Sequence, residues 1–383
     1  MQFTYRMPTK IVFGPGVLGQ LGEICESLGD KPLIVTGRQS ARKSGVLEQA
    51  LAQLPMAVVY EGVEEDPGTE QCDEAAAFGR KAGCGIVVPI GGGSPMDAAK
   101  AIAGLMLNDG PCADYVGRDT FTKGALPIVA VPTTAGTGSE VTPYSVLVNE
   151  RDGQKQTIGG ENLFPRAALL DPLLTHTMPR SVTVNTGLDA LSQAMEGVVS
   201  KKSTPKSDVL ALEACRIIRR WLPAAAEDGN NAGARSQMLY AAMLSGCVIA
   251  QTATTLVHGM GYLFTTEYGV AHGMANALLL TPLFQHNAQY APEKVAAVAE
   301  ALGHPCGATP DATRKAIGEA IHELLGVLSV PPAAAAAGVE ASRLAEFADG
   351  IAATPYRYRN QIGHIDAARI RELYEQAHQG ALA

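Results

Sequence analysis

Short apolar runs alternate with helical stretches through the first part of the chain, from Lys31 to about Val148. Each run is rich in β-branched residues and is short enough to be a buried strand, and the stretches between them carry apolar residues at helical spacing. Alternation of this kind predicts a parallel sheet covered by helices. The predicted strands are Pro32–Thr36, Ala57–Tyr60, Gly85–Ile90 and Pro127–Val131.

The pattern changes after about Pro179, where hardly any strand-like run remains. Apolar residues recur there at helical spacing, which predicts a mostly helical second half. The pair Pro331–Pro332 followed by Ala333–Gly338 indicates a connection that leads into a short helix. We therefore predict an α/β domain over residues 1–180 and an all-α domain over residues 181–383. The predicted helical stretches are Val182–Trp221, Arg235–Ala250 and Ile317–Leu328.

The composition is that of a protein with a large core, because 46% of the residues are hydrophobic and 18% are charged. A net charge of -8 without a long basic run argues against a nucleic-acid partner, which would require clustered cations. Met1–Phe13 does not resemble a signal peptide, and no run of about 18 apolar residues is present to span a membrane. We expect a cytoplasmic protein with seven reduced cysteines and no membrane partner.

A glycine-rich turn, Gly91–Gly93, directly follows the predicted strand Gly85–Ile90 and precedes a helical pattern, Met96–Met106. The glycines permit positive φ and let a pyrophosphate approach the N–H groups at the start of the helix, where the helix dipole favours an anion. Ser94 suits the cap of this helix and Pro95 suits its first turn. The alternative is a tight strand-to-helix turn that binds nothing, since glycine-rich turns alone are weak signals.

A second segment of small residues, Pro132–Glu140, follows the predicted strand Pro127–Val131. The carboxyl ends of parallel strands are where such sheets bind ligands, so two loops of this kind together favour a dinucleotide. Thr133, Thr134 and Thr137 either contact that ligand or bond only to their own turn.

Four polar side chains in the helical half form a candidate metal site. Asp189 and Gln193 lie four residues apart on one helix face, and His258 and His272 flank an apolar segment that contains glycine. Hydride transfer at an alcohol carbon requires a Lewis acid for the substrate oxygen, which three or four nitrogen and oxygen ligands can hold with one position open. The other histidines are interpreted as structural or surface residues: His176, His286, His304, His322, His364 and His378.

Four motifs follow one another along the chain: GGGSPMDAAK at Gly91–Lys100, PTTAGTGSEVT at Pro132–Thr142, TGLDALSQAMEG at Thr186–Gly197, and the region from LVHGM to AHGMANALLL within Leu256–Pro282. In this order they resemble the iron-containing (group III) alcohol dehydrogenases, within the dehydroquinate synthase-like superfamily. The resemblance covers nearly the whole chain and implies a Rossmann-like dinucleotide-binding domain, a helical metal-binding domain and a cleft between them. It also implies a homodimer or a higher homo-oligomer.

The family's Asp, His, His and His metal ligands correspond by position to Asp189, Gln193, His258 and His272, so glutamine replaces the second ligand. An amide oxygen is harder than imidazole, which shifts the expected preference toward oxygen-binding ions. We expect one divalent metal, iron first, with zinc or manganese as alternatives. Three interpretations remain: a site with an amide ligand, a three-ligand site completed by water, and a metal-free paralogue. Tyr262, where many relatives carry a histidine near the nicotinamide, lines the substrate site, relays a proton, or only packs.

The cofactor preference is predicted from the residues after the strand Pro32–Thr36. NAD-preferring relatives place an aspartate there against the ribose hydroxyls, whereas this chain has Gly37 and then Arg38. Without a carboxylate to repel a 2′-phosphate, Arg38 with Arg42 or Lys43 favours NADP over NAD, unless these cations are simply a solvated helix start. The resemblance implies further cofactor contacts at Asp66 (adenosine ribose), Gly92, Gly93, Ser94 and Asp97 (pyrophosphate), Thr133, Thr134 and Thr137 (adenine and nicotinamide), Val146 and Lys155.

The predicted activity is that of an NAD(P)-dependent, metal-dependent oxidoreductase that interconverts a small alcohol and its aldehyde or ketone, in the direction of reduction. His272 and Tyr262 are the predicted catalytic residues. Two alternatives remain open at this point: a lyase of the dehydroquinate synthase type, which uses its nicotinamide transiently, and a metal-free dinucleotide-binding protein without turnover.

Overall fold

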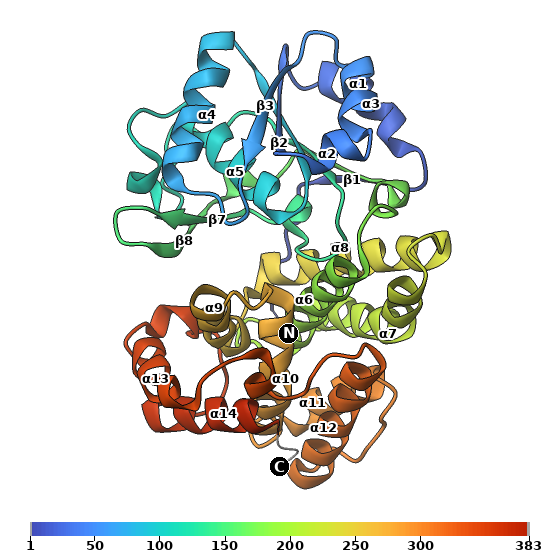
Figure 1. Cartoon of the computed structure of the whole chain (residues 1–383), viewed down its shortest axis with the longest axis vertical. Helices are drawn as coiled ribbons and strands as arrows, with labels where there is room; N and C mark the ends of the chain where they lie inside the picture. Colours follow the sequence, from blue (N-terminus) through green and yellow to red (C-terminus); the bar gives the residue numbers. More distant parts are fainter. Residues whose placement is uncertain (1, 381–383) are drawn as a thin grey trace. The chain divides into compact units, whose positions relative to one another are not determined.

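The computed structural model describes residues 2–380 of the 383-residue chain. These residues form two compact units. Arg6–Met178 make up the first, called here the sheet unit, and residues 179–380 with residues 2–5 make up the second, called the helical unit. Figure 1 draws the sheet unit in blue to green and most of the helical unit in yellow to red.

A six-stranded sheet with the order β1-β9-β6-β4-β2-β3 forms the centre of the sheet unit. Each pair of neighbouring strands is parallel, so the carboxyl ends of the strands all lie at one edge. Its strands are β1 (Lys10–Phe13), β2 (Pro32–Gly37), β3 (Val58–Val63), β4 (Ile86–Gly91), β6 (Val129–Pro132) and β9 (Ala167–Leu170). The four predicted strands are therefore confirmed as β2, β3, β4 and β6, and the parallel α/β class with them.

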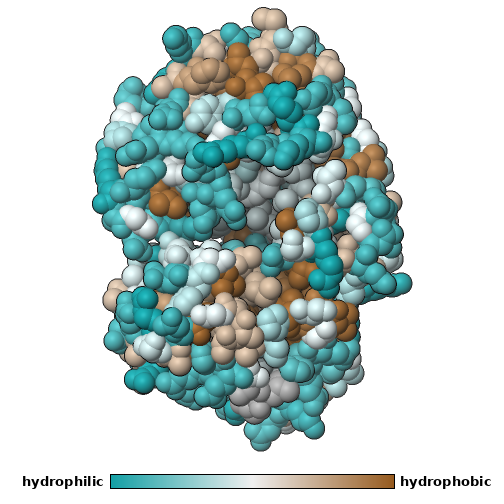
Figure 2. Space-filling model, in the orientation of Figure 1, coloured by the Kyte–Doolittle hydropathy of each residue, from teal (hydrophilic) through white to brown (hydrophobic). Residues whose placement is uncertain are grey.

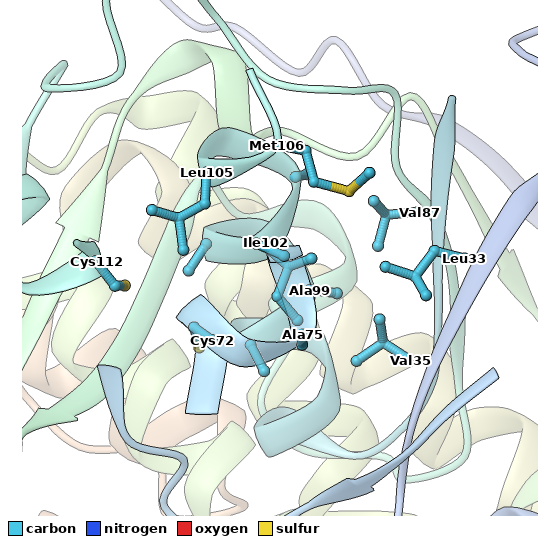
Figure 3. Packing of buried hydrophobic residues seen from close by; sticks show 14 of the residues in the cluster. Leu33, Val35, Cys72, Ala75, Val87, Ala99, Ile102, Leu105, Met106 and Cys112 are labelled. Carbon is cyan, nitrogen blue, oxygen red and sulfur yellow. The ribbon is translucent and has the colours of Figure 1, made fainter. Parts of the chain in front are cut away.

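Helices cover both faces of this sheet, which explains why its inner strands are buried at nearly every position and, apart from Thr36, carry no polar side chain. Leu33 and Val35 of β2 pack into one cluster with α4 and α5, whereas Ile34 between them packs into the other cluster with α1 and α3. Figure 3 shows Leu33, Val35 and Val87 facing Ala99 and Ile102 across the first cluster. The helices of the unit are η1 (Val17–Gln20), α1 (Leu21–Glu26), α2 (Ser40–Lys43), α3 (Val46–Gln53), α4 (Thr69–Ala82), α5 (Gly93–Leu105), η2 (Cys112–Tyr115), η3 (Ser139–Val141), η4 (Glu161–Leu163) and η5 (Pro172–Thr175).

A small second sheet, with the order β5-β8-β7, was not predicted. Its strands are β5 (Gly117–Arg118), β7 (Tyr144–Asn149) and β8 (Gln154–Gly159), of which β7 and β8 form an antiparallel hairpin. The hairpin is tied to α5 because the backbone N–H of Val146 donates to Asp97 Oδ2 at 3.0 Å. The Ser145 hydroxyl donates to the backbone carbonyl of Asp97 at 2.6 Å.

The helical unit is built from α-helices and short 3₁₀ turns, as predicted. The predicted helical stretch Val182–Trp221 is two helices, because Thr204 and Ser207 form a capping box and Pro205 begins a second helix. Its elements are α6 (Arg180–Val199), α7 (Pro205–Glu227), α8 (Ala232–Thr252), α9 (Leu256–Tyr268), α10 (His272–Asn287), α11 (Pro292–Ala301), α12 (Pro310–Val327), η6 (Ala334–Ala337), η7 (Ala341–Arg343), α13 (Leu344–Ala352), η8 (Pro355–Arg357) and α14 (Ala367–Gln379).

Hydrophilic residues cover most of the face seen in Figure 2, with apolar groups in separate patches. Within residues 2–380 no single helix is both long and apolar enough to cross a membrane. The helices α8 and α9 meet that test only as a pair bent by 112°.

Candidate active site

The glycine-rich turn lies where β4 passes into α5. Gly91 has φ of 154°, and a Cβ built on it would lie 2.7 Å from Pro95 Cγ, so a larger residue would strain this turn. Helix α5 begins at Gly93, and Gly92 is its N-cap. The prediction that Ser94 caps the helix is therefore wrong, because the helix starts before it and Ser94 lies in the first turn. Pro95 occupies that turn as predicted, where a missing N–H costs nothing.

The two predicted nucleotide loops lie against each other. Strand β4 pairs with β6 through Gly91 and Pro132, and the Thr133 N–H donates to the Gly91 carbonyl at 2.9 Å. A Cβ on Gly92 would lie 3.2 Å from Thr134 Cγ2, and one on Gly93 would lie 2.9 Å from Thr137 Cγ2. Little space is left for larger residues where the loops touch, and the threonines border the half-buried N-terminus of α5. This arrangement can bind a pyrophosphate.

Asp97 and Lys100 belong to a buried polar network on α5 rather than to an exposed surface. Asp97 Oδ1 accepts from the Ser139 hydroxyl at 2.6 Å, and Lys100 Nζ donates to the same hydroxyl at 2.5 Å and to the Tyr144 carbonyl at 2.6 Å. Burial lowers the pKa of Lys100 to about 8 and raises the pKa of nearby Glu140 to about 7. The predicted contact between Asp97 and a pyrophosphate stays a prediction, since both carboxylate oxygens already accept protein hydrogen bonds.

The residues predicted to select the cofactor lie at the carboxyl end of β2, the neighbour of β4. Gly37 ends the strand, and Arg38 is exposed and paired with Glu64. Arg42 pairs with Glu61 at 2.7 Å and with Glu48 at 3.1 Å. The arginines therefore lie where a ribose phosphate is expected in this class of fold, and each has an acidic partner that such a phosphate must displace.

Asp66 and Lys155, which are far apart in sequence, meet in the structure. Lys155 Nζ on β8 lies 2.5 Å from Asp66 Oδ1 in the segment after β3. Val146 on β7 is exposed. The structure thus joins two of the predicted cofactor contacts in one ion pair, and their contact with a cofactor stays a prediction.

Three of the four predicted metal ligands converge in the helical unit. One ligand atom from each of Asp189 on α6, His258 on α9 and His272 on α10 lies within 4.8 Å of the others. Asp189 Oδ1 is 3.4 Å from His258 Nε2 and 3.6 Å from His272 Nε2. Ligands about 2.1 Å from a tetrahedral metal are about 3.4 Å apart, so these separations fit a divalent cation. The side chains of Asp189, His258 and His272 are 7%, 15% and 44% exposed, so the group is most open at His272.

Glu196, two turns after Asp189 on α6, orients His258, and sequence reasoning assigned it no role. Its buried carboxylate accepts from the Thr255 N–H at 2.8 Å and the Thr255 hydroxyl at 2.7 Å, and it pairs with His258 Nδ1. This pairing holds the proton on Nδ1 and turns Nε2 toward Asp189. Burial opposes a charged His258, but Glu196 and Asp189 outweigh it and raise the pKa of His258 to about 10. The site therefore favours positive charge where a metal would be held.

Two amide side chains flank Asp189. Gln193 Nε2 donates to Asp189 Oδ2 at 3.0 Å, and Asn276 Nδ2 donates to Asp189 Oδ1 at 3.2 Å and lies 3.2 Å from His272 Nε2. Burial works against the charge of Asp189, but the hydrogen bond from His258 and the histidine charges lower its pKa. Gln193 therefore reaches the predicted site as a hydrogen-bond donor to a ligand, and its role as a metal ligand stays a prediction.

Tyr262 lies one turn after His258 on α9, so the two side chains share a helix face. Its ring is partly buried, and the Arg357 guanidinium lies over it with Cζ 4.5 Å from the ring centroid. Arg357 was not singled out from the sequence. Nothing in its local pattern points to α9, because it lies in η8, far along the chain.

Comparisons with known proteins agree with this geometry. Residues 8–172 match the model of the iron-containing alcohol dehydrogenases, and residues 183–378 match the C-terminal model of the Fe-containing alcohol dehydrogenase family. The chain therefore belongs to the iron-containing alcohol dehydrogenase family. It is an oxidoreductase that interconverts an alcohol and the corresponding carbonyl compound.

Three relatives illustrate the similarity. The 1,3-propanediol dehydrogenase of Citrobacter freundii is 36% identical over 86% of this chain and 87% of its own length. The crystal structure of a 1,3-propanediol oxidoreductase matches with a TM-score of 0.93 and 34% identity, covering 98% of this chain and 100% of the other. The structure of a sulfoacetaldehyde reductase from Bifidobacterium kashiwanohense in complex with NAD+ matches with a TM-score of 0.87 and 31% identity over 99% of each chain.

Proposed function

We propose that this chain is an NADPH-linked, metal-dependent reductase of small aldehydes. The observation that carries the proposal is the convergence of Asp189, His258 and His272 within 4.8 Å. A carboxylate and two imidazoles form a donor set that suits iron, zinc or manganese. A divalent metal bound there supplies Lewis-acid polarisation of the substrate carbonyl.

The residues of the site then have distinct tasks. Asp189 supplies negative charge, and Glu196 keeps the proton of His258 on Nδ1 so that the Nε2 lone pair is available. His272, the most exposed of the three, borders the position left for the substrate oxygen. A bound nicotinamide would supply the hydride for the carbonyl carbon, and the proton for the oxygen would come from water or through a relay that includes the cofactor ribose and Tyr262.

The preference for NADP is supported by the end of β2. Gly37, the last residue of β2, offers no carboxylate to the ribose. Arg38 and Arg42 follow it in the chain within five residues and provide guanidinium groups. Without a cofactor, Arg38 pairs with Glu64 and Arg42 pairs with Glu61. Binding of a 2′-phosphate therefore exchanges one anionic partner of an arginine for another. The proposal also includes a cytoplasmic location and a homodimer or larger homo-oligomer.

The identity of the substrate depends on residues around the metal site. The relatives include a 1,3-propanediol dehydrogenase and a sulfoacetaldehyde reductase, whose named substrates are an uncharged diol and an anionic sulfonate, so the family relationship does not decide between these classes.

The test uses purified protein loaded with iron, zinc or manganese, a panel of aldehydes, and both NADPH and NADH. We expect net oxidation of NADPH, at a higher kcat/KM than with NADH. His272→Ala should abolish turnover while leaving binding of NADPH, measured by calorimetry, unchanged. Turnover that survives in His272→Ala excludes this site, and nicotinamide that is returned unchanged indicates a lyase instead of a reductase.

A further inference from the structure

Arg357 packs against α9, the helix that carries the predicted metal ligand His258. Its Cζ lies 4.5 Å from the centroid of the Tyr262 ring, and its Nε donates to the Tyr356 hydroxyl at 3.3 Å. The backbone of Arg357 also lies against α9, because a Cβ built on Gly259 would come within 3.4 Å of the Arg357 carbonyl oxygen. Gly259 is the residue after His258, so the close approach of η8 to α9 occurs beside a predicted metal ligand.

Tyr262 links this guanidinium to the site. Residues four apart on a helix have Cβ atoms about 5–6 Å apart on the same face, so the side chains of His258 and Tyr262 are neighbours on one face of α9. The guanidinium stacked on the Tyr262 ring is then on the order of 10 Å from the triad Asp189, His258 and His272. His258, Tyr262 and Arg357 are each partly exposed, so solvent can reach all three residues.

A stacked arginine is well suited to binding an anion. The aromatic face fixes the plane of the guanidinium, and the five N–H donors lie in that plane, where more than one acceptor, including a carboxylate, a sulfonate or a phosphate, can be bound. Such pairs are often bidentate, which selects both charge and orientation. Lysine cannot reproduce this, because its ammonium is a point charge on a flexible stem.

We propose that Arg357, positioned by Tyr262, binds the anionic end of the substrate, so that the enzyme reduces short aldehydes carrying an acidic group at the far end. The inference rests on the proposed reductase function, in which the carbonyl oxygen lies at the triad. With single bonds of about 1.5 Å, a chain of about two to four carbons spans the space between the triad and the guanidinium. In the reaction, NADPH gives hydride to the aldehyde carbon and becomes NADP, and a proton from solvent completes the alcohol, while the acidic group is unchanged.

The test compares succinic semialdehyde, sulfoacetaldehyde and phosphonoacetaldehyde with butanal and propanal, at constant ionic strength. The wild-type enzyme should have a higher kcat/KM for at least one anionic aldehyde than for the uncharged aldehydes. Arg357→Met should lower the kcat/KM for that aldehyde by about 10- to 100-fold, mainly through KM, and change the value for butanal by less than about threefold. Arg357→Lys should recover only part of the loss.

Arg359 provides the matched control. It is exposed and lies two residues after Arg357. It accepts a hydrogen bond from Lys201 through its backbone carbonyl, so replacing its side chain leaves this bond in place. Arg359→Met should behave as wild type with every aldehyde. Tyr262→Phe keeps the aromatic face and should retain the preference for anions, whereas Tyr262→Leu should lose it.

Failure of this inference is distinguishable from failure of the proposed function. Reduction of butanal with no preference for anionic aldehydes, or an equal loss for both classes in Arg357→Met, overturns the role of Arg357 and leaves the reductase intact. If no aldehyde is reduced, the proposed function fails, and calorimetry with succinate then tests the anion site directly. Binding of succinate that Arg357→Met abolishes supports the anion site, and equal binding by both proteins refutes it.

Discussion

Glu196 controls which nitrogen of His258 faces the metal position, so its replacement by glutamine tests the site sharply. The carboxylate accepts two hydrogen bonds from Thr255 and pairs with His258 Nδ1. In Glu196→Gln the amide NH₂ faces Nδ1, which must then accept a hydrogen bond. The imidazole proton moves to Nε2, the atom directed at Asp189, and this tautomer cannot bind a cation.

The expected loss of metal affinity in Glu196→Gln is about 10- to 100-fold, as is usual when the partner of a metal-ligating histidine is removed. That loss corresponds to about 1.4–2.7 kcal/mol of binding free energy. Calorimetric titration of the chelator-treated protein with zinc and with manganese measures it directly. The metal content of the protein as purified should fall in parallel.

Thr255→Val is the matched control, since it removes one hydrogen bond to Glu196 Oε1 but leaves the carboxylate beside His258. This variant should keep its metal affinity within about threefold of wild type. Binding of NADPH by both variants should be unchanged, because the glycine-rich turn is in the other unit. Wild-type affinity in Glu196→Gln, with both variants folded, would refute the argument that Glu196 sets the tautomer of His258.

Three further predictions concern the metal site and the buried network. Gln193→His should raise zinc affinity relative to manganese by at least about tenfold, as measured by competitive titration, because imidazole is the softer ligand; an unchanged ratio would place Gln193 outside the coordination sphere. In the metal-free protein the pKa of His258 is raised from 6.5, its value in the unfolded chain, to about 10. The free energy of unfolding contributed by its charge is therefore fully present below pH 6.5 and is lost as pH rises through about 10. The melting temperature should therefore fall more steeply over this range for wild type than for His258→Gln, and parallel slopes would contradict it. Lys100→Met leaves Asp97 and Glu140 buried without their cation and should reduce the free energy of unfolding in urea by about 3–5 kcal/mol, and a change below about 1 kcal/mol would show that the network is not ionic.

The parallel sheet was predictable because its signals are local. Strands buried on both faces are continuous apolar runs, and the glycine-rich turn after β4 breaks the pattern sharply. The hairpin β7–β8 was missed because β8, with the sequence QKQTIG, has little apolar character. The break between α6 and α7 was also missed, although Thr204, Pro205 and Ser207 carry the signature of a helix start.

The residues of the candidate metal site could be predicted from the sequence, but the hydrogen bonds that orient them could not. Asp189, His258 and His272 were identified through motifs, and their convergence needs three helices that no local pattern brings together. Glu196 could have been found as a carboxylate seven residues after Asp189, in a stretch of α6 that is otherwise buried and mostly apolar. Arg357 could not, since only tertiary packing brings η8 to α9.

The predicted nucleotide site has two separate parts, the turn after β4 and the arginines after the neighbouring strand β2. The turn after β4 is braced by Asp97 and Ser139, whereas the arginines after β2 are braced only by surface glutamates. We therefore expect that cofactor preference can be changed at Gly37 and Arg38 without disturbing the turn that is predicted to bind the diphosphate. To adapt this enzyme to a cheaper cofactor, substitutions should be made at the exposed end of β2, and α5 should be left unchanged.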